Sequence, residues 1–184
     1  MGSKYLVISD NHGNMRNMKN VIKKFGKGID GLIHCGDLEF FPTELEDMVD
    51  CPVYMACGNC DYLWDERPLE QVFDLGPHRA LVTHGHRYDI RWDLTMLEDR
   101  AQELGVDVIF FGHSHRPAIL QFPESGLTCY NPGSIALPRQ FQPMGPTFML
   151  LDVDDDGTLH PTHCYFGPRG KKFISFDLAP EVIQ

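Results

Sequence analysis

The sequence YLVISDNHGN, from Tyr5 to Asn14, decides how the rest of the chain is interpreted. A mostly apolar run leads directly into a polar loop that contains Asp10, His12 and Gly13. A short apolar run that ends at turn-forming residues is typical of a buried strand. In α/β proteins, ligands bind at the carboxyl ends of such strands, so this loop is a candidate site.

The pattern of an apolar strand followed by a polar loop recurs along the chain. Further strands are predicted at residues 31–35, 53–57, 79–83 and 108–111, and the loops after them contain Gly36-Asp37, Gly58-Asn59-Cys60-Asp61, His84-Gly85-His86 and Gly112-His113-Ser114-His115. Because strand ends gather at one edge of a sheet, these loops can converge although they are far apart in sequence.

The remaining elements indicate two sheets with helices outside. Apolar spacing predicts helices at 15–25, ended by Gly26, and at 95–104, ended by Gly105. Thr43 with Glu46 has the pattern of a capping box for a helix through Val49. Strands are also predicted at residues 71–75, 118–122, 127–130, 147–153 and 158–166. Strand–helix alternation followed by hairpins favours an α/β fold in a single domain that spans residues 1–184.

Composition excludes several classes of protein. The chain has 184 residues, 42% of them hydrophobic and 23% charged, which is ordinary globular usage. With 26 acidic and 16 basic residues, the net charge of -10 argues against an extended nucleic-acid surface or a membrane surface. No run is apolar enough to span a membrane, and no secretion signal precedes the six cysteines. We therefore expect reduced thiols and a cytoplasmic protein.

The polar loops offer seven candidate metal ligands. They combine carboxylate, amide and imidazole groups, which suit Mn, Fe, Co, Ni or Zn better than a thiolate site or a calcium cage would. Seven ligands are too many for one tetrahedral ion but fit two ions that share a carboxylate. Two ions about 3.5–4 Å apart can clamp the attacking and leaving oxygens of a phosphoryl displacement. The candidates are Asp10, His12, Asp37, Asn59, His84, His113 and His115.

The order of these motifs resembles that of the calcineurin-like metallophosphoesterases. The stretch Asn131–Ser134 and the pair Pro138-Arg139 further resemble the small bacterial and archaeal phosphodiesterases of the YfcE-like branch. The resemblance implies a four-layer α/β/β/α sandwich of two mixed sheets. It also implies a dimetal site at the C-terminal ends of the strands.

The resemblance also implies the role of each ligand. One ion would be held by Asp10, His12, Asp37 and His115, and the other by Asp37, Asn59, His84 and His113. The bridging Asp37 would share both ions with a hydroxide that attacks phosphorus in line, and Asn59 would also lie near the phosphate. Asp61 would orient a ligand. The expected cofactors are two divalent transition-metal ions, preferably Mn, with Ni, Co, Fe or Zn as alternatives.

Cys60 departs from the pattern of many family members, which have histidine at this position and use it toward the leaving group. A thiol with an ordinary pKa of about 8.5 is a weak hydrogen-bonding group. His86 is the alternative proton donor. We therefore expect a metal-dependent phosphodiesterase that prefers small or activated diesters with good leaving groups over monoesters.

Two other functions stay open. DNA-repair nucleases share the metal motifs, although the acidic charge argues against them. A eukaryotic retromer scaffold subunit has this fold and works mainly as an interaction protein, but there the ligand set is eroded. The expected partners are a small phosphodiester and a second copy of the chain in a homo-oligomer, with no extended nucleic-acid surface and no membrane.

Several polar residues outside the motifs have no assigned role. Ser134 either contacts the site or only forms a turn, and Arg139 either binds phosphate or forms a surface ion pair. His34 is predicted to be a satisfied core or supporting histidine. His160 and His163 are expected to face solvent.

Overall fold

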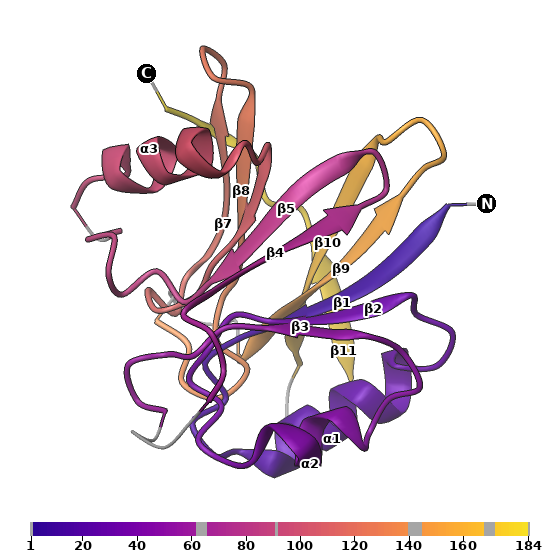
Figure 1. Ribbon diagram of the computed structural model, residues 1–184. Coiled ribbons are helices and arrows are strands. Elements are labelled where there is room, and N and C mark those ends of the chain that lie inside the picture. Colours follow the sequence, from indigo (N-terminus) through magenta and orange to yellow (C-terminus); the bar gives the residue numbers. More distant parts are fainter. Residues whose placement is uncertain (1, 62–65, 91, 140–144, 168–171, 184) are drawn as a thin grey trace.

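Two six-stranded mixed sheets pack face to face, with helices on their outer faces (Figure 1). The computed structural model describes residues 2–61, 66–90, 92–139, 145–167 and 172–183. Helices α1 (Met15–Phe25) and α2 (Pro42–Glu46) lie against the first sheet, and α3 (Thr95–Leu104) lies against the second. The predicted four-layer α/β/β/α sandwich is confirmed.

The first sheet joins parallel and antiparallel strands in the order β11-β10-β9-β1-β2-β3. Strands β1, β2 and β3 run parallel, and β1 also pairs antiparallel with β9. The register places Ile8 beside His34, so β1 and β2 end at the same edge. The strands are β1 (Ser3–Ile8), β2 (Gly31–His34), β3 (Val53–Met55), β9 (Thr147–Val153), β10 (Leu159–Phe166) and β11 (Phe173–Phe176).

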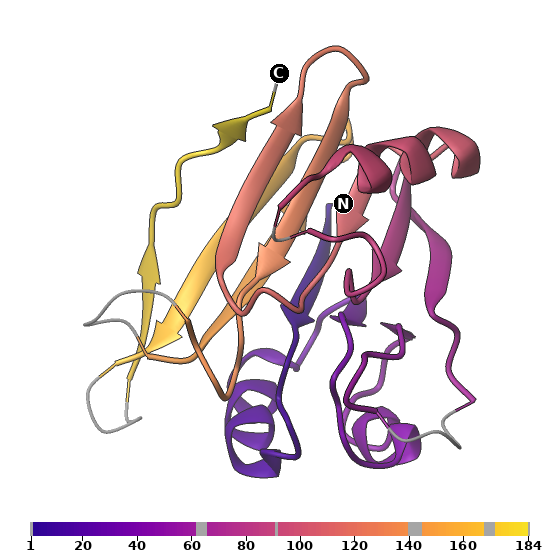
Figure 2. The same cartoon turned by 90° about the vertical axis from the view of Figure 1, so that its left-hand side faces the viewer.

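The second sheet has the order β12-β7-β8-β6-β5-β4. Strands β4 and β5 form the predicted hairpin, while β5, β6 and β8 are parallel. Figure 2 shows β7 and β8 along one side of the molecule, with β12 beside β7. The strands are β4 (Glu70–Leu75), β5 (His78–Thr83), β6 (Val108–Phe110), β7 (Pro117–Phe122), β8 (Leu127–Pro132) and β12 (Glu181–Val182).

Three apolar clusters separate the four layers. Along β1, Val7 points into the cluster between the sheets, whereas Leu6 and Ile8 point toward α1 and α2. The strand is buried on both faces because side chains alternate along it, which explains its continuous apolar sequence. A third cluster holds α3 on the second sheet through Leu97 and Ala101.

The two longer helices have the predicted bounds. Gly105 ends α3 in the left-handed conformation, with φ of 62°. Gly26 ends α1 with φ of -77°, which any residue can adopt. Glycine is favoured there because a Cβ would lie only 2.6 Å from the carbonyl oxygen of Ile22. No helix in the described ranges is long and apolar enough to cross a membrane.

The structure corrects the prediction near residue 43. Helix α2 begins at Pro42 rather than being capped by Thr43, and it ends at Glu46. The Glu44 carboxylate accepts the backbone N–H of Phe41 at 3.3 Å, so the N-terminal contact lies two residues earlier than the predicted capping box. Proline fits the first helical position because its missing N–H has no partner there in any case. Strands β11 and β12 were not predicted.

Candidate metal centre

The loops that follow β1 and β2 leave the first sheet side by side. The backbone N–H of Asp10 donates to the carbonyl of Gly36 at 3.0 Å, and that of His12 donates to the carbonyl of Asp37 at 3.0 Å. Across the sandwich, the backbone N–H of His113 donates to Asp10 Oδ2 at 3.1 Å. The two sheets therefore meet at this edge, as the sequence predicted.

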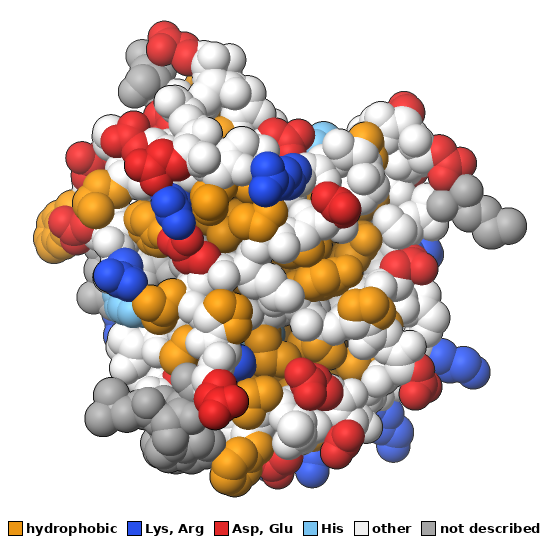
Figure 3. All heavy atoms as spheres, in the orientation of Figure 1, with side chains coloured by type: hydrophobic (Ala, Val, Ile, Leu, Met, Phe, Trp, Pro, Cys, Tyr) orange, Lys and Arg blue, Asp and Glu red, His pale blue; other side chains and the backbone are white. Residues whose placement is uncertain are grey.

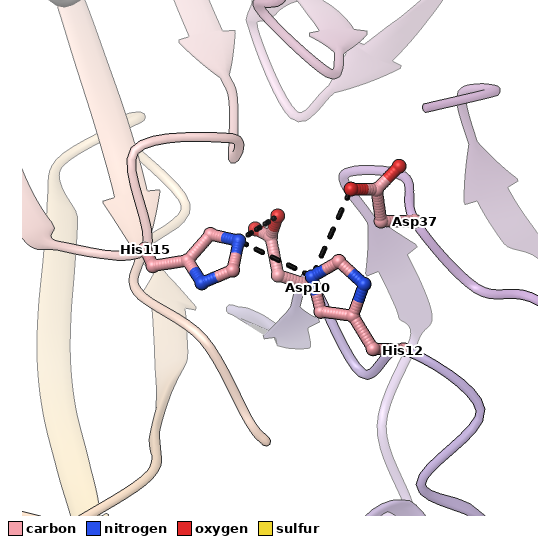
Figure 4. A group of neighbouring side chains, drawn as sticks. All are labelled: Asp10, His12, Asp37 and His115. Carbon is pink, nitrogen blue, oxygen red and sulfur yellow. Dashed lines mark hydrogen bonds and ion pairs between the residues drawn. The ribbon is translucent and has the colours of Figure 1, made fainter. Parts of the chain in front are cut away.

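Four of the predicted ligands form one compact group. The ligand atoms of Asp10, His12, Asp37 and His115 all lie within 4.8 Å of one another, and the side chains point toward a common centre (Figure 4). His115 Nε2 lies 3.1 Å from Asp10 Oδ1 and 3.2 Å from His12 Nε2. Asp37 Oδ2 lies 3.8 Å from His12 Nε2.

The partners of the two rings direct electron pairs to this centre. His115 Nδ1 donates to the carbonyl of Leu137 at 2.6 Å, and His12 Nδ1 lies 2.6 Å from Glu39 Oε1. These acceptors favour the tautomers with a proton on Nδ1, which leaves a lone pair on each Nε2. Asp10 Oδ1 is buried, with no hydrogen-bond partner among the described residues. Lone pairs and a carboxylate that face one another at about 3 Å are stabilised by a cation, so the donors fit a bound metal.

A second group is built around His84. Its Nδ1 donates to the carbonyl of Cys35 at 2.7 Å, which directs Nε2 to Asn59 Oδ1 at 3.1 Å and to Asp37 Oδ2 at 3.3 Å. The His113 ring lies with its centroid 5.2 Å from that of His84. Burial disfavours the charged ring, but the Asp37 and Asp10 carboxylates outweigh it and raise the pKa of His84. The carboxylates thus create a local demand for positive charge.

Asp37 stands between the two groups. Its Oδ2 faces both His12 and His84, while its Oδ1 accepts the backbone N–H of Cys60 at 2.7 Å. Although burial works in the opposite direction, the hydrogen bonds from His84 and Cys60 hold the pKa of this carboxyl well below its usual range. One carboxylate oxygen of Asp37 therefore lies near histidines of both groups, and its bridging role stays a prediction.

Backbone strain is concentrated at this site. Residues other than glycine adopt a positive φ at a cost of about 1–3 kcal/mol each, and such strain gathers where function requires it. Among the described non-glycine residues with positive φ, Asp89 alone has no place in the site. The others are Asp10 (52°), His12 (43°), Asp37 (56°), Glu39 (58°), His113 (61°) and His115 (60°).

Asp61 holds two of the loops together. Its carboxylate accepts the backbone N–H groups of Asp37 at 3.0 Å, Gly58 at 2.7 Å and Glu39 at 2.8 Å. Arg67 pairs with it at 2.9 Å in a buried setting. The sequence predicted that Asp61 would orient a ligand; in the structure it contacts the backbone of the ligand loop.

Ser134 links the site to the segment beyond β8. Its hydroxyl donates to the carbonyl of Asp10 at 2.8 Å and accepts the N–H of Leu137 at 2.7 Å. Leu137 in turn supplies the carbonyl that orients His115. The sequence left open whether Ser134 contacts the site or only forms a turn. In the structure it does both, because it forms the turn and contacts the backbone of Asp10.

Of the four predicted catalytic residues, Asp37 is buried at the centre, whereas Asn59, Cys60 and His86 are at least partly exposed at its rim. Asn59 and Cys60 are exposed, and the Asn59 amide donates to Cys60 Sγ at 3.3 Å. Burial, with the Asp37 and Glu39 carboxylates, raises the pKa of Cys60 to about 12, so the thiol keeps its proton at neutral pH. The His86 ring lies 5.4 Å from that of His84, and its Nδ1 is buried with no partner in the described ranges. Burial and His84 lower the pKa of His86.

Glu39 is the site residue that the sequence analysis missed. Its only signal is its place two residues after Asp37. The contact with His12 depends on a positive φ at both residues, which residue spacing does not reveal.

The predictions for the outlying histidines have mixed outcomes. His34 is buried between Asn11 Oδ1, at 2.8 Å, and the backbone N–H of Gly36, so its supporting role is confirmed. His163 was expected to face solvent, which is wrong: it is 1% exposed, and its Nε2 lies 2.9 Å from the carbonyl of Asn131. The prediction failed because β10 lies between β9 and β11, and the His163 ring packs beside that of Phe176 on β11, with centroids 5.8 Å apart.

Comparisons with known proteins agree with this geometry. A model of the calcineurin-like phosphoesterase superfamily domain matches residues 4–156. The probable metallophosphoesterase YsnB of Bacillus subtilis is 40% identical over 151 residues, which cover 81% of this chain and 85% of that protein. A predicted phosphoesterase from Streptococcus pneumoniae superposes with a TM-score of 0.77 at 26% identity, covering 96% of this chain and 99% of that one. Vps29 of Entamoeba histolytica, complexed with zinc, has the same fold, with a TM-score of 0.74 at 22% identity over 95% of this chain and 99% of that one.

Proposed function

The chain belongs to the calcineurin-like phosphoesterase superfamily, and from this premise we propose that it is a phosphodiesterase that hydrolyses small or activated phosphodiesters with two divalent transition-metal ions. The observation that carries the proposal is the convergence of electron-pair donors on two buried carboxylates, those of Asp10 and Asp37. His12, His84 and His115 each have Nδ1 beside an acceptor and Nε2 beside a carboxylate oxygen.

The residues divide into two binding groups that share Asp37. One cation fits among Asp10, His12, Asp37 and His115; the other fits among Asp37, Asn59, His84 and His113. When bound, such ions neutralise phosphate charge and lower the pKa of coordinated water toward neutrality. Imidazole with carboxylate and amide oxygen suits a borderline or moderately hard cation, and we propose manganese, with Ni, Co, Fe or Zn as alternatives.

The rim residues favour a diester over a monoester. The Asn59 amide lies against His84 and Cys60, where it can hold a phosphate oxygen by hydrogen bonding. The Cys60 thiol keeps its proton but gives only a weak hydrogen bond to a departing oxygen. A substrate whose alcohol leaves without strong protonation, such as an aryl diester, depends least on that donor. A monoester also brings one more negative charge to the Asp37 and Glu39 carboxylates.

Substrate selectivity tests this proposal. Wild type is assayed with an aryl phosphodiester, an aryl phosphomonoester and an alkyl monoester in the presence of Mn, Ni, Co, Zn or Mg. We expect the highest kcat/KM for the aryl diester and the lowest for the alkyl monoester. Comparable turnover of the alkyl monoester and the aryl diester would count against it. Salt-dependent cleavage of single-stranded DNA would indicate a nuclease instead.

A scaffold role is the second candidate, and the likeness to Vps29 structures favours it. That likeness extends over the whole fold, at 20–22% identity for three of these structures. Against a scaffold role, every predicted ligand position of this chain has a residue that can bind a metal, and strained loops bring four of these side chains, those of Asp10, His12, Asp37 and His115, into one group. A purified protein that binds no transition metal would support the scaffold.

A further inference from the structure

A cavity of about 800 Å³ lies on the outer face of the second sheet, next to the metal-site loops. Its apolar wall comes from the segment between β5 and α3, from β7 and from the residue after β12. Figure 2 shows that segment crossing in front of the sheet, on the side where β12 runs beside β7. The apolar wall includes Ile90, Leu94, Phe111, Leu120 and Ile183.

Two arginines of this cavity are joined to the backbone of a predicted metal ligand. Arg116 directly follows His115, and the backbone N–H of Arg139 donates to the carbonyl of His115 at 3.1 Å. Ser114, also in the lining, lies between His113 and His115. One face of this loop therefore carries the metal-site histidines, and residues of the same loop line the cavity.

The charges of the cavity leave both arginines available. In the described ranges, neither Arg116 nor Arg139 has a carboxylate within ion-pair distance, and both are exposed. Of the two acids in the lining, Asp93 is occupied, because its Oδ1 accepts the backbone N–H of Thr95 at 2.9 Å and the hydroxyl of Thr95 at 2.7 Å. Glu181 lies on the exposed strand β12. Both acids keep their charge, but among the described residues neither of them forms an ion pair with Arg116 or Arg139, so an anion entering the cavity meets two guanidinium groups that no carboxylate has paired.

The aromatic composition of the rim indicates what kind of group the cavity accepts. Trp92 is 85% exposed and lines the cavity, and Phe111 lies in its wall. An exposed tryptophan offers a flat apolar surface that a ring can cover. Arginine adds a planar fork that binds carboxylate or phosphate in a bidentate manner.

We propose that this cavity binds the alcohol part of the substrate that stays on phosphorus when the other alcohol leaves, and that it selects an apolar or aromatic alcohol bearing a carboxylate or phosphate group. The inference rests on the proposed phosphodiesterase function. Arg116 and Arg139 hold the anionic group, while the apolar wall and Trp92 cover the ring. The reacting phosphate then lies at the metal centre, beside the His113–His115 loop that also borders the cavity through Ser114.

Two diesters with the same leaving group test the proposal: 4-nitrophenyl phenyl phosphate and 4-nitrophenyl 4-carboxyphenyl phosphate. We expect wild type to show a KM about tenfold lower for the carboxylated diester, the effect of one charge-assisted contact. In the variant that combines Arg116→Gln with Arg139→Gln, we expect the ratio of the two KM values to fall to about one, whatever the change in kcat. Arg79→Gln is the matched control, because Arg79 is exposed at the opposite end of β5.

Binding without added metal separates this inference from the proposed function. Calorimetry with 4-carboxyphenyl phenyl phosphate is expected to show tighter binding than with diphenyl phosphate, and the difference disappears in the double arginine variant. Arginine-dependent binding without any hydrolysis would support the cavity and contradict the phosphodiesterase. Equal KM and equal binding for the paired compounds, or a preference that survives in the double variant, would overturn the inference.

Discussion

At the level of single residues, the contact between Glu39 and His12 distinguishes this site from its motifs. Glu39 Oε1 lies 2.6 Å from His12 Nδ1, and the backbone of Glu39 is held by Asp61. A carboxylate behind a metal-binding imidazole fixes its tautomer and increases its basicity. Glu39 therefore positions a predicted ligand without being one of the seven.

Replacing Glu39 is expected to weaken metal binding more than folding. Glu39→Ala should lower the affinity for Mn²⁺ by about 10–100-fold, the usual effect of losing such a partner. Glu39→Gln keeps an acceptor for the His12 N–H and should lose less. Calorimetric titration of metal-free protein measures both affinities, and thermal unfolding monitors the fold. Equal affinities for wild type and Glu39→Ala would exclude a positioning role.

His34 makes the stability of the fold depend on pH. Burial, reinforced by the charge of Arg67, lowers the pKa of His34 to about 4. Because the unfolded chain takes up this proton at about pH 6.5, the fold loses stability as pH falls from 6.5 toward 4. The contribution is on the order of 2–3 kcal/mol at pH 4. Urea unfolding of metal-free protein measures it.

The matched variant for His34 is His34→Gln, which keeps a polar side chain but does not titrate. We expect the free energy of unfolding of this variant to fall less steeply below pH 6.5 than that of wild type. Parallel pH profiles for the two proteins would show that His34 contributes nothing to the slope.

Residue types in the motifs were sufficient to predict the ligand candidates but not their environment. Asp10, His12, Asp37 and His115 lie in loops that follow apolar strands, and their side-chain chemistry makes them candidate ligands. The tautomer of each ring depends on partners such as Leu137 and Glu39, whose approach is set by turns with positive φ. Spacing along the chain contains no information on that approach.

At the level of elements, the loop that begins at Gly58 must pass close to the Asp37 loop. A Cβ at Gly58 would collide with the Asp37 carboxylate and with its backbone nitrogen. Gly58→Ala is therefore expected to displace Asp37, to lower the free energy of unfolding by about 1–3 kcal/mol and to weaken Mn²⁺ binding. Urea unfolding and calorimetric titration measure the two effects.

A glycine remote from the site serves as the control for this substitution. Gly126, in the turn between β7 and β8, has φ of +74° with nothing near a Cβ position. Gly126→Ala should cost about 1 kcal/mol of backbone strain and leave Mn²⁺ affinity unchanged. If the Gly58→Ala protein binds Mn²⁺ as tightly as the Gly126→Ala protein does, the close approach of the Gly58 loop does not hold Asp37 in a metal-binding position.

Element prediction succeeded where a strong pattern fixes both ends. Helix α3 has apolar spacing and a terminal glycine in the left-handed conformation, so its bounds followed from the sequence. Helix α2 is short, and Phe41 at its start has no side-chain acceptor, so a Thr43 capping pattern suggested the wrong start. Strand β12 has two residues and depends on pairing with β7, which is a tertiary contact.

On the scale of the whole molecule, acidic and basic side chains are both spread over the surface, as Figure 3 shows for one face. The two buried carboxylates of the site, rather than the net charge of -10, are therefore expected to make the stability of the fold depend on metal. Asp10 and Asp37 are buried in the same group of side chains, and among the described residues no Lys or Arg forms an ion pair with either carboxylate. Ions that bind only the folded state stabilise it, by about 2.7 kcal/mol at a free concentration 100 times the Kd. Excess Mn²⁺ should raise Tm, and a chelator should reverse the shift. A Tm that does not respond to any transition metal would contradict the proposed site.

The most direct test of the central claim is the initial rate of 4-nitrophenol release from bis(4-nitrophenyl) phosphate, measured during titration of metal-free protein with Mn²⁺. We predict that the rate rises to a plateau near two ions per chain, and that Asp37→Asn lowers the plateau by at least about 100-fold because both ions lose a shared carboxylate. If no transition metal stimulates release, or if Asp37→Asn reaches the rate of wild type, the proposed dimetal phosphodiesterase is wrong.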